Sequence, residues 1–205
     1  LKIPGYSDYL HPYDENHVIG IGKDAVDASS EQANARNLDF AWYQGVKISL
    51  FDITDVEHPV EKAKFTIGDR GSDSPVLSDH KALLFDREKK LLVIPVSVAE
   101  IDRSKYRACS DEELNDYNSY NYCLRPNTYG EIVWQGAYVL NIDLNEINLR
   151  GKISHFENKT FVKHGPAKDE VIGAVRVDEY DNVWTKVAII NNSYYQSGQW
   201  KTNAT

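Results

Sequence analysis

The hydrophobic and polar positions of the chain repeat in a module that occurs twice. Its central segment reads GVKISLFDI at residues 45–53 and GAYVLNIDL at residues 136–144, and each copy has an aspartate seven residues after its glycine. In the first copy Val46, Ile48 and Leu50 alternate with polar residues, which is the period-two pattern of a strand with one buried face. Repeated modules of antiparallel strands predict a β-propeller, a fold of radially arranged four-stranded sheets.

The first unit covers residues 7–68 and contains four segments with strand-like patterning. These segments are residues 9–13, 17–22, 45–53 and 61–67, with turn residues between them. A polar stretch, residues 24–39, separates the second strand from the third. We expect an inter-strand excursion there, with one short helix over Ser30–Arg36 that lacks an apolar stripe.

The second unit covers residues 78–157 and has the same plan. Strands are expected at residues 80–86, 90–98, 132–144 and 149–156, with a long polar excursion over residues 99–131. The run LLVIPV is nearly all apolar, as in a strand buried on both faces. Because Pro95 within this run cannot donate a hydrogen bond to a neighbouring strand, we expect a bulge or a missing ladder bond there.

A third unit covers residues 170–205 and is incomplete, with strand-like segments at residues 171–178 and 183–191. The sequence therefore predicts one all-β domain over residues 1–205. We expect a partial β-propeller of about two to three four-stranded antiparallel blades, with long polar inter-strand loops. Propellers close with roughly four to eight blades, so either further blades lie outside this chain or copies self-associate through exposed strand edges.

Composition excludes several classes of function. The 205 residues are 41% hydrophobic and carry a formal net charge of −8. This is enough apolar material for a core, but the chain lacks the clustered cations that bind nucleic-acid phosphates. No segment approaches the ~20 consecutive apolar residues that span a bilayer. We therefore expect a globular chain with no nucleic-acid partner and no membrane span.

The chain has two cysteines, Cys109 and Cys123. Both lie in a polar, tyrosine-rich stretch, where buried free thiols are not expected. A local disulfide between them would close a loop of about 15 residues and would persist in an oxidising compartment. The alternative is a pair of free thiols.

Two longer segments resemble a known family. They read DVEHPVEKAKFTIGDRGSDSPVLSDHKALLFDREKKLLVIPV at residues 55–96 and WQGAYVLNIDLNEINLRGKISH at residues 134–155. Both resemble the secreted archaeal proteins whose C-terminal β-propeller domain is distantly related to WD40 repeats. The resemblance implies an archaeal propeller exported to the cell surface or the medium. It brings no defined biochemical activity and no known site residues.

Asp79 and His80 are the strongest candidates for catalytic residues. A histidine beside a carboxylate can act as a base or bind a metal. Adjacent residues of a strand point to opposite faces, however, so these two side chains would not naturally pair. A structural role, in which His80 locks neighbouring turns, is our main interpretation, and catalysis or ligand binding is the alternative.

The loop GDRGSDSPVLSD at residues 68–79 concentrates oxygen atoms that could bind calcium. Asp69, Asp73 and Asp79 lie among serines and glycines, and Ca²⁺ prefers carboxylate and carbonyl oxygen ligands. Turns are rich in the same residues for local reasons, and the spacing is not that of an EF-hand. Calcium is the one cofactor that the sequence brings into consideration, and an ordinary turn is the alternative.

Residues 104–129 carry the strongest candidate for binding, a group of tyrosines among Asn, Asp and Ser: Tyr106, Tyr117, Tyr120, Tyr122 and Tyr129. Tyrosine with small polar residues gives rigid contact area at low entropic cost, and loops on a rigid frame commonly carry recognition. The leading hypothesis is a non-catalytic extracellular module, secreted or at the cell surface, that binds protein or glycan through these loops. The alternatives are a hydrolase of extracellular polymers that uses Asp79 or His80, and a structural component of a cell envelope.

Overall fold

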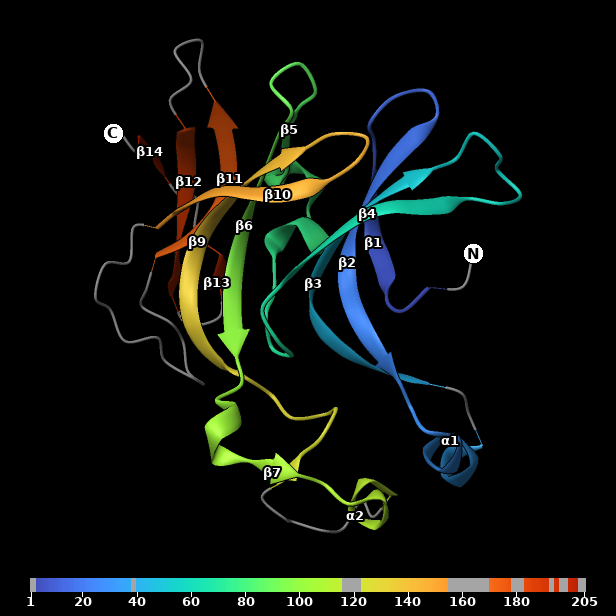
Figure 1. Ribbon diagram of the computed structural model, residues 1–205. Coiled ribbons are helices and arrows are strands. Elements are labelled where there is room, and N and C mark those ends of the chain that lie inside the picture. Colours follow the sequence, from blue (N-terminus) through green and yellow to red (C-terminus); the bar gives the residue numbers. More distant parts are fainter. Residues whose placement is uncertain are drawn as a thin grey trace.

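The computed structural model describes residues 3–37, 40–115, 123–154, 170–177, 183–191, 194–195 and 199–202. These residues form three main antiparallel sheets, one small parallel strand pair and a few short helices (Figure 1). The chain is therefore mainly β, as its alternating pattern predicts.

Sheet 1 consists of β1 (Tyr6–Pro12), β2 (His17–Asp27), β3 (Ala41–Asp52) and β4 (Val60–Ile67). Each strand pairs with the next in antiparallel fashion. The helix α1 (Ser30–Arg36) lies in the connection between β2 and β3 and confirms the predicted short helix. Its start is fixed by a capping box, in which Ser29 and Gln32 bond to each other's backbone N–H.

Sheet 2 repeats this plan with β5 (Leu84–Asp86), β6 (Leu91–Glu100), β9 (Glu131–Ile142) and β10 (Ile147–Ile153). The excursion between β6 and β9 holds η3 (Arg103–Lys105), β7 (Arg107–Ala108), α2 (Asp111–Asn115) and β8 (Cys123–Leu124). Sheet 3 holds β11 (Glu170–Val177), β12 (Val183–Asn191), β13 (Tyr194–Tyr195) and β14 (Gln199–Thr202). Two 3₁₀ turns, η1 (Pro75–Leu77) and η2 (His80–Ala82), connect sheet 1 to sheet 2.

The main core lies between sheets 1 and 2, which pack face to face. Sheet 1 contributes Ile19, Ile21, Val46, Ile48 and Leu50, and sheet 2 contributes Leu92, Ile94, Val96, Tyr138, Leu140 and Ile142. The opposite face of sheet 2 carries a second cluster of Leu91, Val93, Ala137 and Val139, and β11 of sheet 3 lies against β5, β6 and β9. Sheet 2 is thus buried on both faces, as the apolar run in β6 predicts.

The glycine that opens each repeated module is required by a close approach of the backbone. A Cβ atom on Gly45 would lie 2.1 Å from the carbonyl oxygen of Gly68, and one on Gly136 would lie 2.3 Å from that of Ile153. In each repeat the neighbouring carbonyl belongs to the end of the fourth strand or to the residue directly after it. The repeated glycine therefore lets the third and fourth strands come together.

The repeated aspartate at the end of each module caps a turn. Asp52 accepts a hydrogen bond from the backbone N–H of Thr54 at 2.9 Å, and Asp143 accepts one from that of Asn145 at 3.0 Å. These bonds satisfy backbone donors that the ladder no longer pairs. The two copies of the module therefore share the same capped turn as well as the same strand pattern.

The polar face of β3 is buried in an unexpected way. Lys47 is only 1% exposed, and its Nζ donates to the carbonyl oxygen of Pro4 at 2.7 Å. The carboxylate of Glu61 lies 3.5 Å from the same ammonium and accepts a hydrogen bond from the Ser49 hydroxyl at 2.6 Å. The segment before β1 therefore covers a small polar network on the face of sheet 1 that lies away from sheet 2.

One sequence prediction in the second unit is wrong in detail. Residues 80–83 do not belong to a strand, because Asp79 caps the 3₁₀ turn η2 and delays β5 until Leu84. Of the two alternatives expected at Pro95, the structure shows the missing ladder bond and not the bulge, which lies between Val98 and Ala99. The strand β5 pairs with β6 only as far as Val93, and the Ser74 hydroxyl donates to the Pro95 carbonyl at 2.6 Å.

Within the part of the chain that the structure describes, no helix has the length and apolar character needed to cross a membrane.

The packing between sheets 1 and 2 can be tested at Ile94, which is fully buried in β6. We expect Ile94→Ala to lower the free energy of unfolding by about 2–5 kcal/mol, because it leaves a cavity between the sheets. Val56→Ala, at a side chain that is 79% exposed, should change it by less than about 0.5 kcal/mol. Urea unfolding followed by circular dichroism measures both, and equal effects would contradict the assigned core.

Candidate functional site

The two polar excursions occur at equivalent positions of the two repeats. One connects β2 to β3 and the other connects β6 to β9, so each lies between the second and third strands of its sheet. Because sheets 1 and 2 pack face to face, the excursions meet at one end of the molecule, where α1, α2 and β7 lie together (Figure 1). We call the combined surface of residues 24–37, 40–44, 100–115 and 123–131, with the loop at residues 68–73, the excursion platform.

Two glutamines join the excursions directly. The Nε2 of Gln32, in α1, donates to the carbonyl oxygen of Leu114 at 2.8 Å, and the Nε2 of Gln44 donates to that of Pro126 at 2.9 Å. Gln32 is only 6% exposed, and its Oε1 also accepts from the indole N–H of Trp42 at 3.4 Å. Buried amides with several partners hold their surroundings in one arrangement, so the two excursions are held together as one surface.

Arg70 links sheet 1 to both excursions. Its Nη1 donates to the carbonyl oxygen of Tyr43 at 2.8 Å, and its Nη2 donates to the hydroxyl of Tyr129 at 3.1 Å. The guanidinium carbon lies 4.4 Å from the centroid of the Tyr129 ring and 5.8 Å from that of Trp42. A planar guanidinium can donate and stack at the same time, and Arg70 therefore fixes the position of Tyr129.

The base of the second excursion is anchored by Asp69. Its carboxylate accepts two hydrogen bonds from the Arg103 guanidinium, at 2.8 and 3.1 Å, and one from the backbone N–H of Ile101 at 2.8 Å. Partial burial acts to raise the pKa of Asp69, but the bonds from Arg103 and Ile101 outweigh it and hold this pKa below its ordinary value. Asp69 therefore serves as a charged clamp on the excursion.

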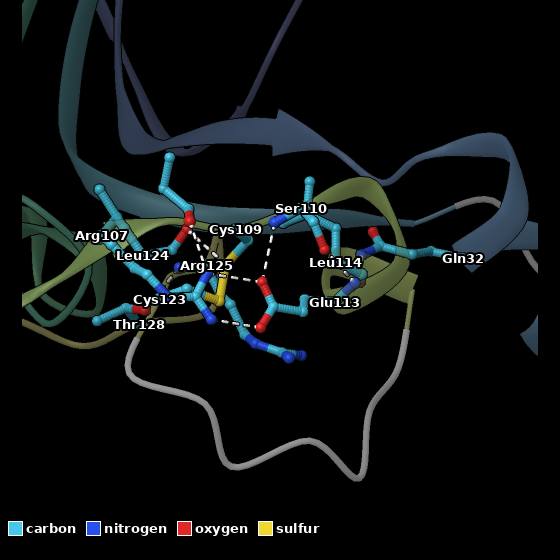
Figure 2. The surroundings of a disulfide bond; sticks show 11 residues. Gln32, Arg107, Cys109, Ser110, Glu113, Leu114, Cys123, Leu124, Arg125 and Thr128 are labelled. Carbon is cyan, nitrogen blue, oxygen red and sulfur yellow. Dashed lines mark hydrogen bonds and ion pairs between the residues drawn. A yellow bond between two sulfur atoms is a disulfide. The ribbon is translucent and has the colours of Figure 1, made fainter.

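The disulfide between Cys109 and Cys123 is present and closes the middle of the second excursion. Figure 2 shows that Arg107, Ser110 and Glu113 surround it, with Gln32 approaching Leu114 from the other excursion. The Glu113 carboxylate accepts from the Arg107 guanidinium and, at 2.9 Å, from the backbone N–H of Ser110. The prediction of a local disulfide is confirmed, and the bond ties β8 to the residue that follows β7.

Two cavities flank Tyr129, whose side chain is 65% exposed. The larger, about 460 Å³, is a groove lined by acidic, aromatic and aliphatic residues that include Glu100, Glu131, Tyr106 and Val133. The smaller, about 300 Å³, is lined by Arg70, by Gln44 and by the ion pair of Lys23 and Asp73. The platform thus presents one fixed, exposed aromatic ring between two cavities, an arrangement suited to recognition.

The structure places two of the five candidate tyrosines in this site. Tyr129 lines both cavities and Tyr106 lines the larger one, whereas Tyr117, Tyr120 and Tyr122 lie outside the described residues. Sequence reasoning did not find Arg70, Gln32 or Gln44 as members of the site. Their partners lie far away along the chain, since Arg70 and Tyr129 are 59 positions apart and Gln32 and Leu114 are 82 positions apart, so no local pattern could report them.

The three aspartates considered for calcium are not brought together. Asp69 bonds to Arg103, Asp73 pairs with the Lys23 ammonium at 3.0 Å, and Asp79 accepts from the backbone N–H of Lys81 at 3.0 Å. Across the described residues, no group of three His, Cys, Asp or Glu side chains could hold a metal ion. These carboxylates are used for ion pairing and turn capping, which fits the ordinary turn that was the alternative to calcium.

Asp79 and His80 also serve separate contacts. Asp79 caps η2, while the His80 ring stacks on Tyr9 of β1 with 6.0 Å between centroids. This stacking joins the connection between the sheets to the edge strand of sheet 1. The geometry fits the structural role that we favoured for His80.

The Asp69 clamp leads to a pH dependence with a defined sign. A carboxyl group whose pKa is depressed by folding contributes stability above its ordinary pKa of 3.8, and that stability is lost as the pH falls through the lower, folded value. We expect Asp69→Asn to lower the free energy of unfolding by about 1–2 kcal/mol at neutral pH. Urea unfolding at several pH values should show this difference shrinking below pH 3.8, and a difference independent of pH would contradict the clamp.

The effect of the hydrogen bonds and stacking of Arg70 can be tested separately from the effect of its positive charge. Arg70→Lys keeps the charge but loses the forked donor that reaches Tyr43 and Tyr129, so we expect faster chymotrypsin cleavage within residues 100–131. The matched substitution Arg150→Lys, at an exposed residue of β10, should leave cleavage unchanged. Mass spectrometry of the fragments locates the cut sites, and equal cleavage of both variants would show that Arg70 does not hold the excursion.

Two archaeal proteins are similar to part of this chain. An uncharacterized protein of Archaeoglobus fulgidus is 39% identical over 95 residues, which are 46% of this chain and 12% of that protein. An uncharacterized protein of Methanocaldococcus jannaschii is 35% identical over 117 residues, which are 55% of this chain and 16% of that protein. The chain therefore spans only a small part of the length of these relatives. No solved structure is significantly similar to it.

The family model of the beta propeller domain matches residues 1–201. The match spans sheets 1 and 2 and all of sheet 3 except the last residue of β14. The chain therefore belongs to the beta propeller domain family.

Proposed function

We propose that the chain is a non-catalytic recognition module that binds protein or glycan through the excursion platform. The observation that carries this proposal is the exposed ring of Tyr129, which Arg70 holds between two cavities. Propellers are rigid frames on which many different functions are mounted, so the function must be argued from the site. Binding or scaffolding roles are common for this fold.

The support for Tyr129 favours recognition because it reduces the entropic cost of binding. Ordering a free side chain on association costs roughly 0.5–1.5 kcal/mol. The Tyr129 hydroxyl already has a donor in Arg70, and its ring is already stacked. The ring therefore offers contact area to a partner at little further cost, as in binding sites built from tyrosine.

An extracellular setting is part of this proposal. The disulfide of the second excursion would persist in an oxidising environment and be reduced in most cytosols. We therefore place the module in a secreted or cell-surface protein of an archaeon. The archaeal relatives support the organism in this proposal and give no information on the compartment.

The edge strands of the sheets favour a role in recognition through loops rather than a role in which chains assemble by pairing their strands. The outer edge strand β4 carries exposed Lys62 and Lys64, and β10 carries exposed Arg150 and Lys152 beside a bulge near Leu149. Charged residues and bulges on edge strands oppose pairing with another chain. A structural role based on edge-to-edge association therefore receives less support than binding at the platform.

The proposal can be tested with printed arrays of glycans and peptides probed with the full chain. For any ligand that the chain binds, we expect Tyr129→Ala to weaken binding at least about tenfold, because a central aromatic contact is worth roughly 2 kcal/mol. Val56→Ala, in the turn between β3 and β4, should bind normally. Unchanged binding by the Tyr129 variant would place recognition elsewhere on the molecule.

A further inference from the structure

Exposed tyrosines lie at and beside the smaller of the two cavities next to Tyr129. Tyr43 and Tyr129 line this cavity, and both are exposed. Tyr6, which is also exposed, contacts the Tyr43 ring edge to face, with 5.0 Å between the ring centroids. Aromatic rings that other side chains hold in place offer flat apolar contact area to a ligand. These rings therefore form the apolar part of a binding site.

The carboxylate of Asp73 lies at the same cavity. Its Oδ1 accepts from the Lys23 ammonium at 3.0 Å, and the Asp73 side chain is 71% exposed. Within the described part of the chain, the second oxygen, Oδ2, accepts no hydrogen bond. Burial raises the pKa of Tyr6, and the charges of Asp8, Tyr43 and Asp73 raise it further, so this carboxylate lies close to the tyrosines. Asp73 thus keeps one solvated acceptor beside them.

Gln44 and Arg70 add a neutral acceptor and further donors. The Nε2 of Gln44 donates to the carbonyl oxygens of Trp42 and Pro126, which fixes the amide and leaves its Oε1 without a donor among the described residues. The two Nη atoms of Arg70 donate to the Tyr43 carbonyl and the Tyr129 hydroxyl. Each Nη carries a second N–H group. The cavity therefore has both donors and acceptors for a ligand.

The cavity has the size of a small-ligand site. Its volume is about 300 Å³, at the lower end of the roughly 300–1,000 Å³ typical of such pockets. Gly71, with a φ of +107°, lines it, and a Cβ atom there would lie 3.4 Å from the Cδ1 of Tyr129. The missing side chain leaves room beside the ring. A space of this size suits a small molecule or one residue of a polymer.

The charges around the cavity are balanced within the protein. Lys23 pairs with Asp73, and Asp8 lies close enough to both to interact with them electrostatically. Arg70 supplies the second positive charge. Two cations thus lie near two carboxylates, so a charged ligand gains little net attraction, whereas an uncharged ligand can use the individual hydrogen-bonding groups.

We propose that the smaller cavity binds an uncharged sugar residue of a glycan. A C–H face of the sugar ring packs on the exposed ring of Tyr43. Its hydroxyl groups donate to the Oδ2 of Asp73 and the Oε1 of Gln44, and they accept from Arg70. A pyranose combines an apolar face with a rim of hydroxyl groups, which matches this set of side chains. This inference rests on the proposed recognition function and specifies its ligand as an uncharged glycan.

Two-dimensional ¹H–¹⁵N NMR of the full chain tests the inference with neutral sugars: glucose, galactose, mannose and N-acetylglucosamine. Each is added at about 50 mM, because a single sugar held by few contacts binds with a dissociation constant of about 1 mM or weaker. We expect at least one of them to shift the amide signals of Gly71, Ser72 and Asp73. Glycerol at the same concentration, which has hydroxyl groups but no ring, should shift none of them.

Substitutions at Tyr43 separate ring stacking from the integrity of the platform. Tyr43→Ala removes the ring but keeps the backbone carbonyl to which Arg70 donates, so the platform stays in place. We expect this variant to bind the sugar about tenfold more weakly, as for a central aromatic contact. Tyr43→Phe keeps the ring and should bind within about threefold of the parent.

The acceptor role of Asp73 is tested with a matched pair of variants. Asp73→Asn loses a charge-assisted acceptor, so we expect sugar binding about fivefold weaker. Asp55→Asn changes a carboxylate that is 63% exposed and bonded to His58 in the turn between β3 and β4, and it should bind like the parent. NMR titration measures both, and unperturbed signals from sheet 2 show that the variants are folded.

The failure of this inference is distinguishable from the failure of the proposed function. If none of the sugars shifts the signals of Gly71, Ser72 and Asp73, or if Tyr43→Ala and Tyr43→Phe bind equally well, the sugar site is wrong. If Tyr129→Ala still weakens the binding of a peptide from the arrays, recognition at the platform stands without it. Sugar-induced shifts confined to amides outside the excursion platform, together with normal binding by Tyr129→Ala, would contradict both proposals.

Discussion

The face-to-face packing of sheets 1 and 2 is the constraint on which the rest of the structure depends. Each sheet is a meander of four strands, and their facing aliphatic side chains form the main core. Because the two repeats follow the same strand order, this packing places their corresponding hairpins side by side. The two polar excursions arise from these hairpins, so the repeat brings together two segments that share no obvious sequence pattern. The platform is a consequence of the core.

Polar and charged contacts then convert the two excursions into one surface. Gln32 and Gln44 bond directly to the other excursion, while Arg70 and Asp69 connect the loop after β4 to it. Most of these bonds join side chains to backbone groups, which suits segments with few regular elements. The arrangement leaves Tyr129 exposed but supported, between a groove that Glu100 and Glu131 line and a cavity that Arg70 and the Lys23–Asp73 ion pair line. The charge of each cavity therefore depends on how the charged side chains that line it are paired within the protein.

The fold was predictable to the extent that its signals are local. The strand at residues 45–53 and the α1 segment depend on neighbours within a few positions, and the structure contains both. The alternation did not predict that the polar side of this strand, with Lys47 and Ser49, would also be buried. The 3₁₀ turn at His80–Ala82 was missed, because its apolar residues resemble a strand and the capping by Asp79 competes with that pattern. At the site, the disulfide could be predicted and Tyr129 was among the candidates. The partners of Arg70 and Gln32 could not be predicted, because only the packing of the two sheets brings these residues close to their partners.

The central claim is that recognition takes place on the excursion platform. Hydrogen exchange followed by mass spectrometry on the full chain, with and without a glycan or peptide that the chain binds on the arrays, tests it most directly, because slowed exchange locates the bound surface along the chain. We expect slower exchange on binding at residues 43–44, 68–73 and 129–133, with smaller effects at residues 24–37 and 100–106 and none in the turns at residues 53–59 and 87–90. Protection in those turns, or along the edge strands β4 and β10, would contradict the account.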